Sequence, residues 1–289
     1  MDYRYHRPDT LDEALDIAAG SADAEFIAGG TDLMVGADRN GHRLSHLISL
    51  RGVAELAVIE SGPPIRIGAT TPLSLVADHP ALRAHLPALM QSITVFGSPQ
   101  IRNMATIGGN LCNASPAADT APPLLVYGAQ VELCRPGSRR LVPLDEFFRA
   151  PGDTVLEEGE ILAAVVVDPP RPDIRSCYLR RGRIAMDLAI AGVAGLVEMD
   201  GTTCIRASLA AGAVAPIPRR LVRTEAIVGA SDLEAATLAA AAVEAAAEVE
   251  PISDLRASAA YRRHLTGVLT KRCLQQLAPA EGGDRGAPG

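Results

Sequence analysis

The stretch ATIGGNLCNASPAAD, from Ala105 to Asp119, holds a Gly-Gly pair, two asparagines, a threonine, a serine and an aspartate. A loop that only turns the chain needs a single residue at positive φ. A second stretch, FIAGGTDLMVG from Phe26 to Gly36, has the same design: a short apolar run, a Gly-Gly pair and then Thr-Asp. One such loop is equally well explained as an ordinary turn, but two of the same kind predict one ligand between them.

The ligand that suits such loops is a phosphate or pyrophosphate, because glycines leave backbone N–H groups open to approach. Neither loop fits the P-loop, which needs a lysine after its last glycine, or the GxGxxG of a dinucleotide-binding βαβ unit. The chain's one lysine, Lys271, lies near its other end, which disfavours a nucleoside-triphosphate hydrolase. We therefore expect a dinucleotide held mainly by neutral donors, with Asp119 accepting from sugar or ribityl hydroxyls. The predicted donors are Gly29, Gly30 and Thr31 on one side, and Thr106, Gly108, Gly109 and Asn110 on the other.

The composition narrows the class of protein. Of the 289 residues, 48% are hydrophobic and only 3% are aromatic, so Ala, Val, Leu and Ile must pack the core. The net charge of −7 argues against a nucleic-acid-binding protein, which needs a surplus of basic side chains. The sequence has no apolar run of the roughly 20 residues that a membrane span needs, and no signal-peptide pattern at its start. We expect a cytoplasmic protein.

Cysteines and histidines give no metal-binding pattern. The five cysteines (Cys112, Cys134, Cys177, Cys204 and Cys273) are each more than twenty residues from the next, so we expect scattered buried thiols. His42 and His46 have helical spacing but no carboxylate nearby, which favours a solvated or capping role. No metal ligand is predicted.

Local patterns predict two α/β sub-domains, residues 1–55 and 56–172, followed by an α+β domain over 173–277 and a disordered tail over 278–289. Thr10 and Glu13 form a capping box for the first helix, and strands are expected near 24–28, 46–50 and 65–70. Hairpins are expected at RPGS (135–138) and at Asp200-Gly201. The expected helical segments are 81–97, 233–250 and 255–277. The prolines of DPPRPD (168–173) mark the boundary near residue 170.

The two glycine loops also carry a family resemblance. AGGTDL (28–33) and SPQIRNMATIGGNLCNASPAAD (98–119) resemble the FAD-binding medium subunit of the molybdenum hydroxylases, which include the carbon monoxide, nicotinate and xanthine dehydrogenase groups. The longer loop is the specific motif. The resemblance covers nearly the whole chain, because LPALMQSI, VPLDEFF, EGEILAAVVV and RASAAYRRHLTGVLTKR follow the same pattern.

The resemblance implies an α+β fold: a vanillyl-alcohol-oxidase-like (PCMH-type) FAD-binding domain of two α/β sub-domains, then a C-terminal domain of antiparallel sheet and helices. Arg180 falls where the family often has a lysine near the flavin ring. Phe96 falls where the xanthine-oxidising members have an aromatic over the flavin, although a core role at a helix end is equally open. The other cofactor residues that the resemblance implies are Ala28, Gly29, Gly30, Thr31, Asp32, Thr106, Gly108, Gly109, Asn110, Ser115 and Asp119.

The resemblance further implies an electron-transfer subunit with no catalytic side chain of its own. Electrons would pass from molybdenum on a large molybdopterin subunit, through two 2Fe-2S clusters on a small subunit, to FAD and then to an external acceptor. The implied assembly is a dimer of heterotrimers. Three alternatives stay open: a hydroxybenzoyl-CoA-reductase-like medium subunit, a non-catalytic flavin or nucleotide-binding protein, and a free-standing flavin oxidase.

Overall fold

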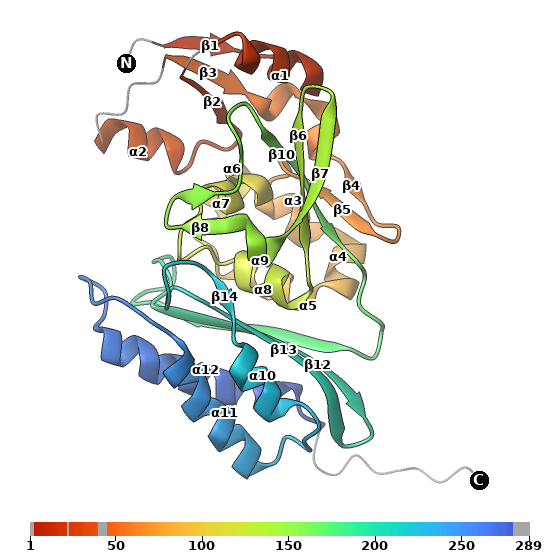
Figure 1. The fold of residues 1–289 in the computed structure, drawn as a ribbon, viewed down its shortest axis with the longest axis vertical. Coiled ribbons are helices and arrows are strands. Elements are labelled where there is room, and N and C mark those ends of the chain that lie inside the picture. Colours follow the sequence, from red (N-terminus) through yellow and green to blue (C-terminus); the bar gives the residue numbers. More distant parts are fainter. Residues whose placement is uncertain (1–2, 22, 40–44, 280–289) are drawn as a thin grey trace.

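The computed structural model describes residues 3–21, 23–39 and 45–279, and Figure 1 shows three layered units running from the N-terminus to the C-terminal helices. The first unit is a parallel sheet of order β1-β3-β2 with two helices. As predicted, Thr10 Oγ1 accepts from Glu13 N at 3.2 Å and caps the first helix. The elements are β1 (Arg4–His6), α1 (Leu11–Ala19), β2 (Ala24–Ile27), α2 (Leu33–Arg39) and β3 (His46–Ser49).

The second unit has a five-stranded antiparallel sheet of order β4-β5-β10-β6-β7, which confirms the RPGS hairpin between β6 and β7. Its strands are β4 (Ile59–Glu60), β5 (Ile65–Gly68), β6 (Gln130–Arg135), β7 (Ser138–Pro143) and β10 (Ile161–Val167), with a small hairpin of β8 (Phe148–Ala150) and β9 (Asp153–Thr154). Its helices are η1 (Leu50–Gly52), η2 (Ala54–Ala57), α3 (Leu73–Asp78), α4 (Pro80–His85), α5 (Pro87–Thr94), α6 (Pro99–Met104), α7 (Ile107–Cys112), α8 (Ala121–Val126) and α9 (Leu144–Phe147).

The C-terminal unit is a four-stranded antiparallel sheet covered on one face by its own helices and on the other by α5 and α8 of the second unit (Figure 1). Strands β12 and β13 form the hairpin predicted at Asp200-Gly201, where Gly201 has a φ of +59°. The elements are β11 (Arg175–Arg181), β12 (Ala191–Asp200), β13 (Thr203–Gly212), β14 (Arg219–Arg220), α10 (Val222–Val228), α11 (Ala235–Glu248) and α12 (Ala259–Leu277).

Two predicted helical segments have different limits in the structure. The segment 81–97 is broken into α4 and α5 at Leu86, whose φ of −125° and ψ of 53° reflect the restriction that Pro87 places on the residue before it. The last helix begins at Ala259 and not at residue 255, because Ser258 caps it and Asp254 holds the preceding turn. The residues 280–289 of the expected disordered tail lie outside the described residues.

The expectation of buried thiols is confirmed for four of the five cysteines, but two of these lie together in the fold. Four cysteines are buried, and Cys177 and Cys273 are a close pair with their sulfurs 2.8 Å apart, although 96 residues separate them. His42 lies outside the described residues, and His46 instead stacks on His6 with Nδ1 3.0 Å from the Nε2 of that residue. Within the described parts of the chain, none of the helices combines the length and apolar character needed to cross a membrane.

Candidate functional site

The first glycine loop, residues 28–32, connects the end of β2 to α2. Gly30 has a φ of +71°, a conformation that glycine adopts without strain. Gly29 lies directly against the chain that precedes the second loop, because a Cβ at this position would be 2.1 Å from the carbonyl oxygen of Met104. The two loops therefore meet backbone against backbone, and only glycine at position 29 permits this approach.

The second loop is anchored to the sheet of the second unit. Thr106 caps α7 by accepting from Gly109 N at 3.0 Å, and Gly108 N donates to Ala69 O at 2.9 Å. A Cβ at Gly108 would lie 2.5 Å from the Cβ of Ala69, so this glycine is required for packing, and it does not line the cleft. Gly109, in contrast, is exposed and faces the cleft.

Between the two loops lies a cleft of about 340 Å³ that brings together most of the predicted cofactor residues. Its wall combines apolar side chains with glycine backbone and neutral polar side chains, and the latter suit a site that holds an anionic group with backbone donors. The predicted residues that line it are Ala28, Gly29, Gly30, Thr31, Asp32, Phe96, Thr106, Gly109 and Asn110. Sequence reasoning missed several others, among them Phe26, Ile27, Cys112, Asn113 and Gly152.

The carboxyl groups that line this cleft belong to Glu25 and Asp32, and the first glycine loop contains Asp32. Burial raises the pKa of Asp32 above the usual value, and a hydrogen bond with the Thr31 side chain partly offsets this effect. A carboxyl group with a raised pKa carries less negative charge at mildly acidic pH. Asp32 therefore keeps its negative charge over a narrower range of pH than an ordinary aspartate.

Asp119 lies behind the cleft, in a buried network that joins the second unit to the C-terminal unit. Tyr178 Oη donates to its Oδ1 at 2.7 Å, and Arg180 Nη1 donates to its Oδ2 at 2.5 Å. Burial raises the pKa of Asp119, while the charge of Arg180 and the hydrogen bonds from Tyr178 and Arg180 act in the opposite direction. Both donors lie on β11. The C-terminal unit therefore supplies the hydrogen bonds that offset the burial of a carboxylate in the stretch from Ala105 to Asp119.

The remaining predicted residues are divided between the cleft and its surroundings. Asn110 is oriented by Thr120, whose hydroxyl donates to its Oδ1 at 2.6 Å. Phe96 is half-buried, lines the cleft and also packs against the core, which accommodates both interpretations of this residue. Ser115 accepts from Ala117 N at 3.2 Å and lines a neighbouring hollow. Arg180 also donates to the carbonyl oxygen of Asp187 at 2.5 Å.

Some of the missed residues had a sequence signal and others had none. Asn113 and Cys112 belong to the quoted stretch Ala105 to Asp119 and could have been included with it. Gly152 is brought to the cleft by a hydrogen bond from its N–H to Ala114 O at 3.1 Å, and nothing near it in the sequence indicates this. Tyr178 likewise reaches Asp119 across 59 residues of chain.

The glycine-lined cleft between the first two units, with antiparallel sheet and helices in the third, fits a cofactor-binding protein of the flavoprotein type, and comparison with known proteins agrees. Residues 1–170 match the family "FAD binding domain in molybdopterin dehydrogenase", and residues 176–277 match "CO dehydrogenase flavoprotein C-terminal domain".

Similar proteins include the putative xanthine dehydrogenase FAD-binding subunit XdhB of Escherichia coli, which is 36% identical over 96% of this chain and 97% of its own. The carbon monoxide dehydrogenase medium chain of Afipia carboxidovorans is 30% identical over 95% of this chain and 96% of its own. A solved structure of carbon monoxide dehydrogenase from Hydrogenophaga pseudoflava matches with a TM-score of 0.93 and 31% identity, covering 96% of this chain and 97% of that one. The chain belongs to the FAD-binding medium subunits of the molybdenum hydroxylases, which are oxidoreductases.

Proposed function

We propose that this chain binds FAD in a PCMH-type fold and passes electrons from 2Fe-2S clusters of a small partner subunit, through FAD, to an external acceptor. The observation that carries the proposal is the meeting of the two glycine loops at Gly29 and Met104, which forms one cleft from two distant segments. A large molybdopterin subunit would complete a heterotrimer, and two heterotrimers would form the whole enzyme. The family membership and the relatives named above support this assignment.

The residues of the cleft fit FAD. Its pyrophosphate would lie between the backbone of Gly29 to Thr31 and that of Thr106 to Asn110, where a Cβ at Gly109 would already approach Thr106 Oγ1 to 2.9 Å. Asp119 would accept from a ribityl or ribose hydroxyl, while Tyr178 and Arg180 keep it oriented.

The redox chemistry belongs to FAD, which takes up and gives out electrons. The chain's own residues bind and orient it. Phe96 offers a ring against which the cofactor can lie, and the hydrogen bonds from Tyr178 and Arg180 hold the buried carboxyl group of Asp119 in place. No side chain of this chain needs to act as a nucleophile or as a general acid.

The experiment that tests FAD binding replaces Gly109 with valine. The added side chain would enter the cleft, so we expect a folded protein that purifies without flavin absorbance. Gly62→Val is the matched control, because no atom lies within 4 Å of a Cβ at Gly62, and it should keep its full flavin content. Normal flavin content in Gly109→Val, with circular dichroism like that of the wild type, would contradict the placement of the pyrophosphate.

A further inference from the structure

A pair of cysteines lies between the sheet and the last helix of the C-terminal unit. Cys177 is on β11 and Cys273 is on α12, 96 positions apart in the sequence. Their sulfur atoms are 2.8 Å apart. Each sulfur also faces the carbonyl oxygen of the other residue, at 3.7 Å for Cys177 Sγ and 4.0 Å for Cys273 Sγ. The two side chains therefore point directly at each other.

The neighbouring strand leaves space for this pair. Gly195 of β12 is the residue that pairs with Cys177 across the two strands. A Cβ at Gly195 would lie 2.5 Å from Cys273 Sγ, so this sulfur occupies the space that a side chain would need. A glycine inside a strand weakens the strand and often marks the close approach of another group. Here the group that approaches is the sulfur of Cys273.

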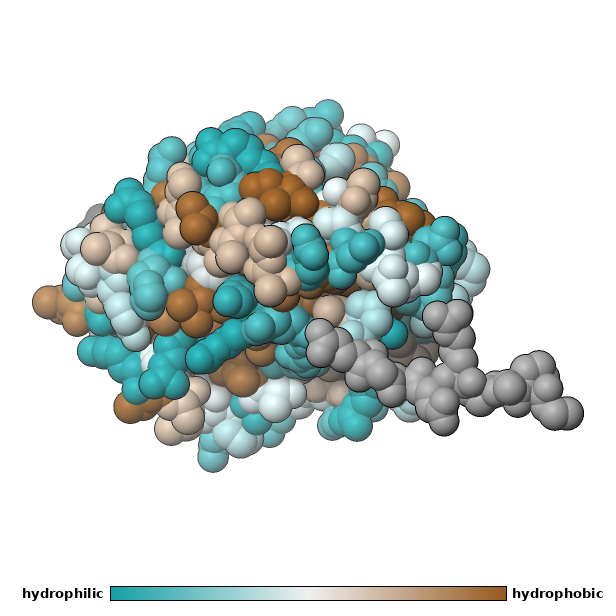
Figure 2. All heavy atoms as spheres, turned by 90° about the horizontal axis from the view of Figure 1, so that it is seen from below, coloured by the Kyte–Doolittle hydropathy of each residue, from teal (hydrophilic) through white to brown (hydrophobic). Residues whose placement is uncertain are grey.

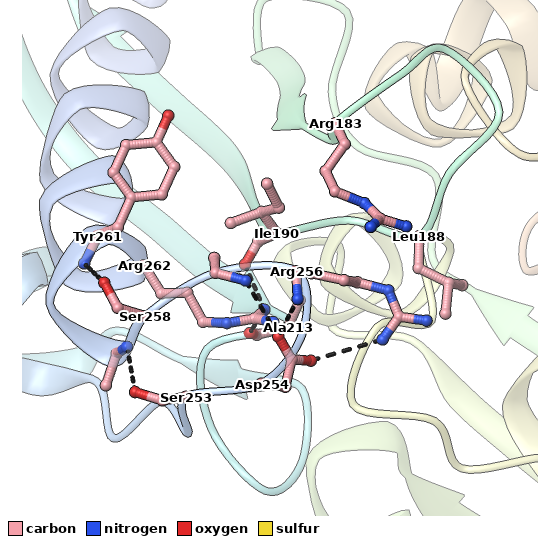
Figure 3. Close-up of polar contacts among 12 residues, drawn as sticks. Arg183, Leu188, Ile190, Ala213, Ser253, Asp254, Arg256, Ser258, Tyr261 and Arg262 are labelled. Atoms are coloured by element: carbon pink, nitrogen blue, oxygen red, sulfur yellow. Dashed lines mark hydrogen bonds and ion pairs between the residues drawn. The ribbon is translucent and has the colours of Figure 1, made fainter.

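Two arginines hold α12 against the sheet, one near each end of the helix. Near the start of α12, Arg262 is buried and donates to the carbonyl oxygen of Ile190 at 2.7 Å (Figure 3). Near the end of α12, Arg175 of β11 donates to the carbonyl oxygen of Leu277 at 3.3 Å. The helix that carries Cys273 is therefore fixed to the sheet on both sides of the cysteine pair.

The pair is shielded from solvent. Cys177 is 1% exposed and Cys273 is 0% exposed, because α12 packs on β11 and β12 and against α11. Figure 2 views the end of the molecule formed by the C-terminal helices, where apolar residues lie in small groups among hydrophilic ones. A bond between the two sulfurs would be shielded in the same way from reducing agents, whose reaction depends on access to the sulfur.

Buried cysteines often serve only as small hydrophobic residues. Cys204, on β13 of the same sheet, fits this description, because its sulfur contacts an oxygen atom, the carbonyl oxygen of Arg206 at 3.3 Å. Cys177 and Cys273 differ, because sulfur faces sulfur. A disulfide bond is about 2.05 Å long, so a movement of less than about 1 Å would bring these sulfurs to bonding distance.

We propose that Cys177 and Cys273 are a redox modification site, at which hydrogen peroxide joins β11 to α12 through a disulfide bond. One sulfur, as a thiolate, attacks an oxygen of the peroxide, and the O–O bond breaks to give a sulfenic acid and hydroxide, which takes up the thiol proton and becomes water. The second sulfur then attacks the sulfenic sulfur and gives its proton to the departing hydroxide, which leaves as a second water. Two thiols thus lose two electrons in total, and one peroxide becomes two waters.

The surroundings of the pair make this reaction slow. A hydrogen bond with Cys177 and burial raise the pKa of Cys273 well above its usual value. The thiolate is the reactive form of cysteine, so the reaction should accelerate as the pH rises. Hydrogen peroxide is a small molecule, and brief local opening at the end of α12 admits it to the pair.

The disulfide would tie α12 to the strand that supports Asp119. Cys177 directly precedes Tyr178 on β11, and Arg180 follows on the same strand. Both of these residues donate to Asp119. A bond between positions so distant in the sequence restricts the unfolded chain strongly. Oxidation should therefore raise the midpoint of thermal unfolding by about 5–15 °C.

The test treats the purified chain with hydrogen peroxide at pH 9, unfolds it in an alkylating reagent and measures its mass. The chain has five cysteines, so the untreated chain should take up five alkyl groups. The treated chain should take up three, and reduction before alkylation should restore the full number. Peptide mass spectrometry should find Cys177 linked to Cys273, and circular dichroism should show the higher thermal midpoint.

The control is Cys204→Ala, which removes an equally buried thiol from the same sheet and should keep both the disulfide and the thermal shift. Cys177→Ala and Cys273→Ala should lose both. A wild-type chain that still takes up five alkyl groups after treatment, or a disulfide between other cysteines, would overturn the proposal. An equal thermal shift in Cys177→Ala would also overturn it. The masses of the wild-type chain decide the question even if a variant fails to fold.

Discussion

Arg180→Met should destabilise the chain strongly, because it removes one member of a buried ion pair. The side chains of Arg180 and Asp119 are 6% and 5% exposed, and their nearest atoms are 2.5 Å apart. Removing one partner of such a pair costs about 3–5 kcal/mol, since the other charge is left buried without compensation. The hydroxyl of Tyr178 still donates to Asp119, which places the expected loss in the free energy of unfolding near the lower limit, about 3 kcal/mol.

The loss should depend on pH in a definite direction. Burial raises the pKa of Asp119, and Arg180 opposes this effect in the wild-type chain. Without the arginine the pKa of Asp119 rises further, so the carboxyl group can escape its penalty by taking up a proton. The deficit of Arg180→Met should therefore be largest at neutral pH and shrink as the pH is lowered. Asp119→Asn in the same chain should recover most of the lost stability.

Urea unfolding followed by circular dichroism measures these differences. The control is Arg83→Met, because the pair of Arg83 and Asp78 is 60% and 74% exposed and such surface pairs contribute about 0–1 kcal/mol. If Arg180→Met and Arg83→Met lose the same stability at pH 7, the account of a buried interdomain pair is refuted.

Three further predictions concern the cleft and the turn before α12. Asp119→Ala should weaken FAD binding ten- to a hundredfold in a flavin-fluorescence titration, since a charge-assisted hydrogen bond is worth roughly 1.5–3 kcal/mol. An unchanged affinity would show that the Asp119 carboxylate does not bind FAD. Gly29→Ala should lower flavin content because the new Cβ would lie 2.1 Å from Met104 O, while Gly62→Ala should not. Hydrogen bonds hold the pKa of Asp254 well below its usual range. The stability that this carboxylate contributes should therefore be complete above about pH 3.9 and be lost as the pH falls further. Acid-unfolding curves should show this loss in the wild-type chain and not in Asp254→Asn.

Local signals predicted much of the fold. The capping residue Thr10, the RPGS turn and the Asp200-Gly201 turn are determined by neighbouring residues, and all three occur as expected. The break between α4 and α5 could have been predicted from Pro87, because the restriction acts on the adjacent residue. The start of α12 could also have been predicted, because Ser258, which caps it, is a local N-cap signal.

The candidate site was predictable where one continuous stretch supplies it. Thr106, Gly109 and Asn110 line the cleft, as their local sequence predicts, whereas Gly108 proved to be a packing glycine because Ala69, nearly forty residues earlier, lies against it. Tyr178 reaches Asp119 only through the docking of β11 on the second unit, and no local pattern encodes that. The proximity of Cys177 and Cys273 is likewise a result of tertiary packing.

The central claim is that this chain is a flavin subunit that depends on partner subunits for its electrons. Following the flavin absorbance after mixing with substrate under anaerobic conditions tests this claim most directly. The purified chain, loaded with FAD and free of other polypeptides, should show no substrate-dependent bleaching. Addition of the iron–sulfur and molybdenum subunits should make bleaching rapid. Reduction of the isolated chain by an organic substrate at a rate comparable to that of the complex would contradict the account and identify a free-standing oxidase.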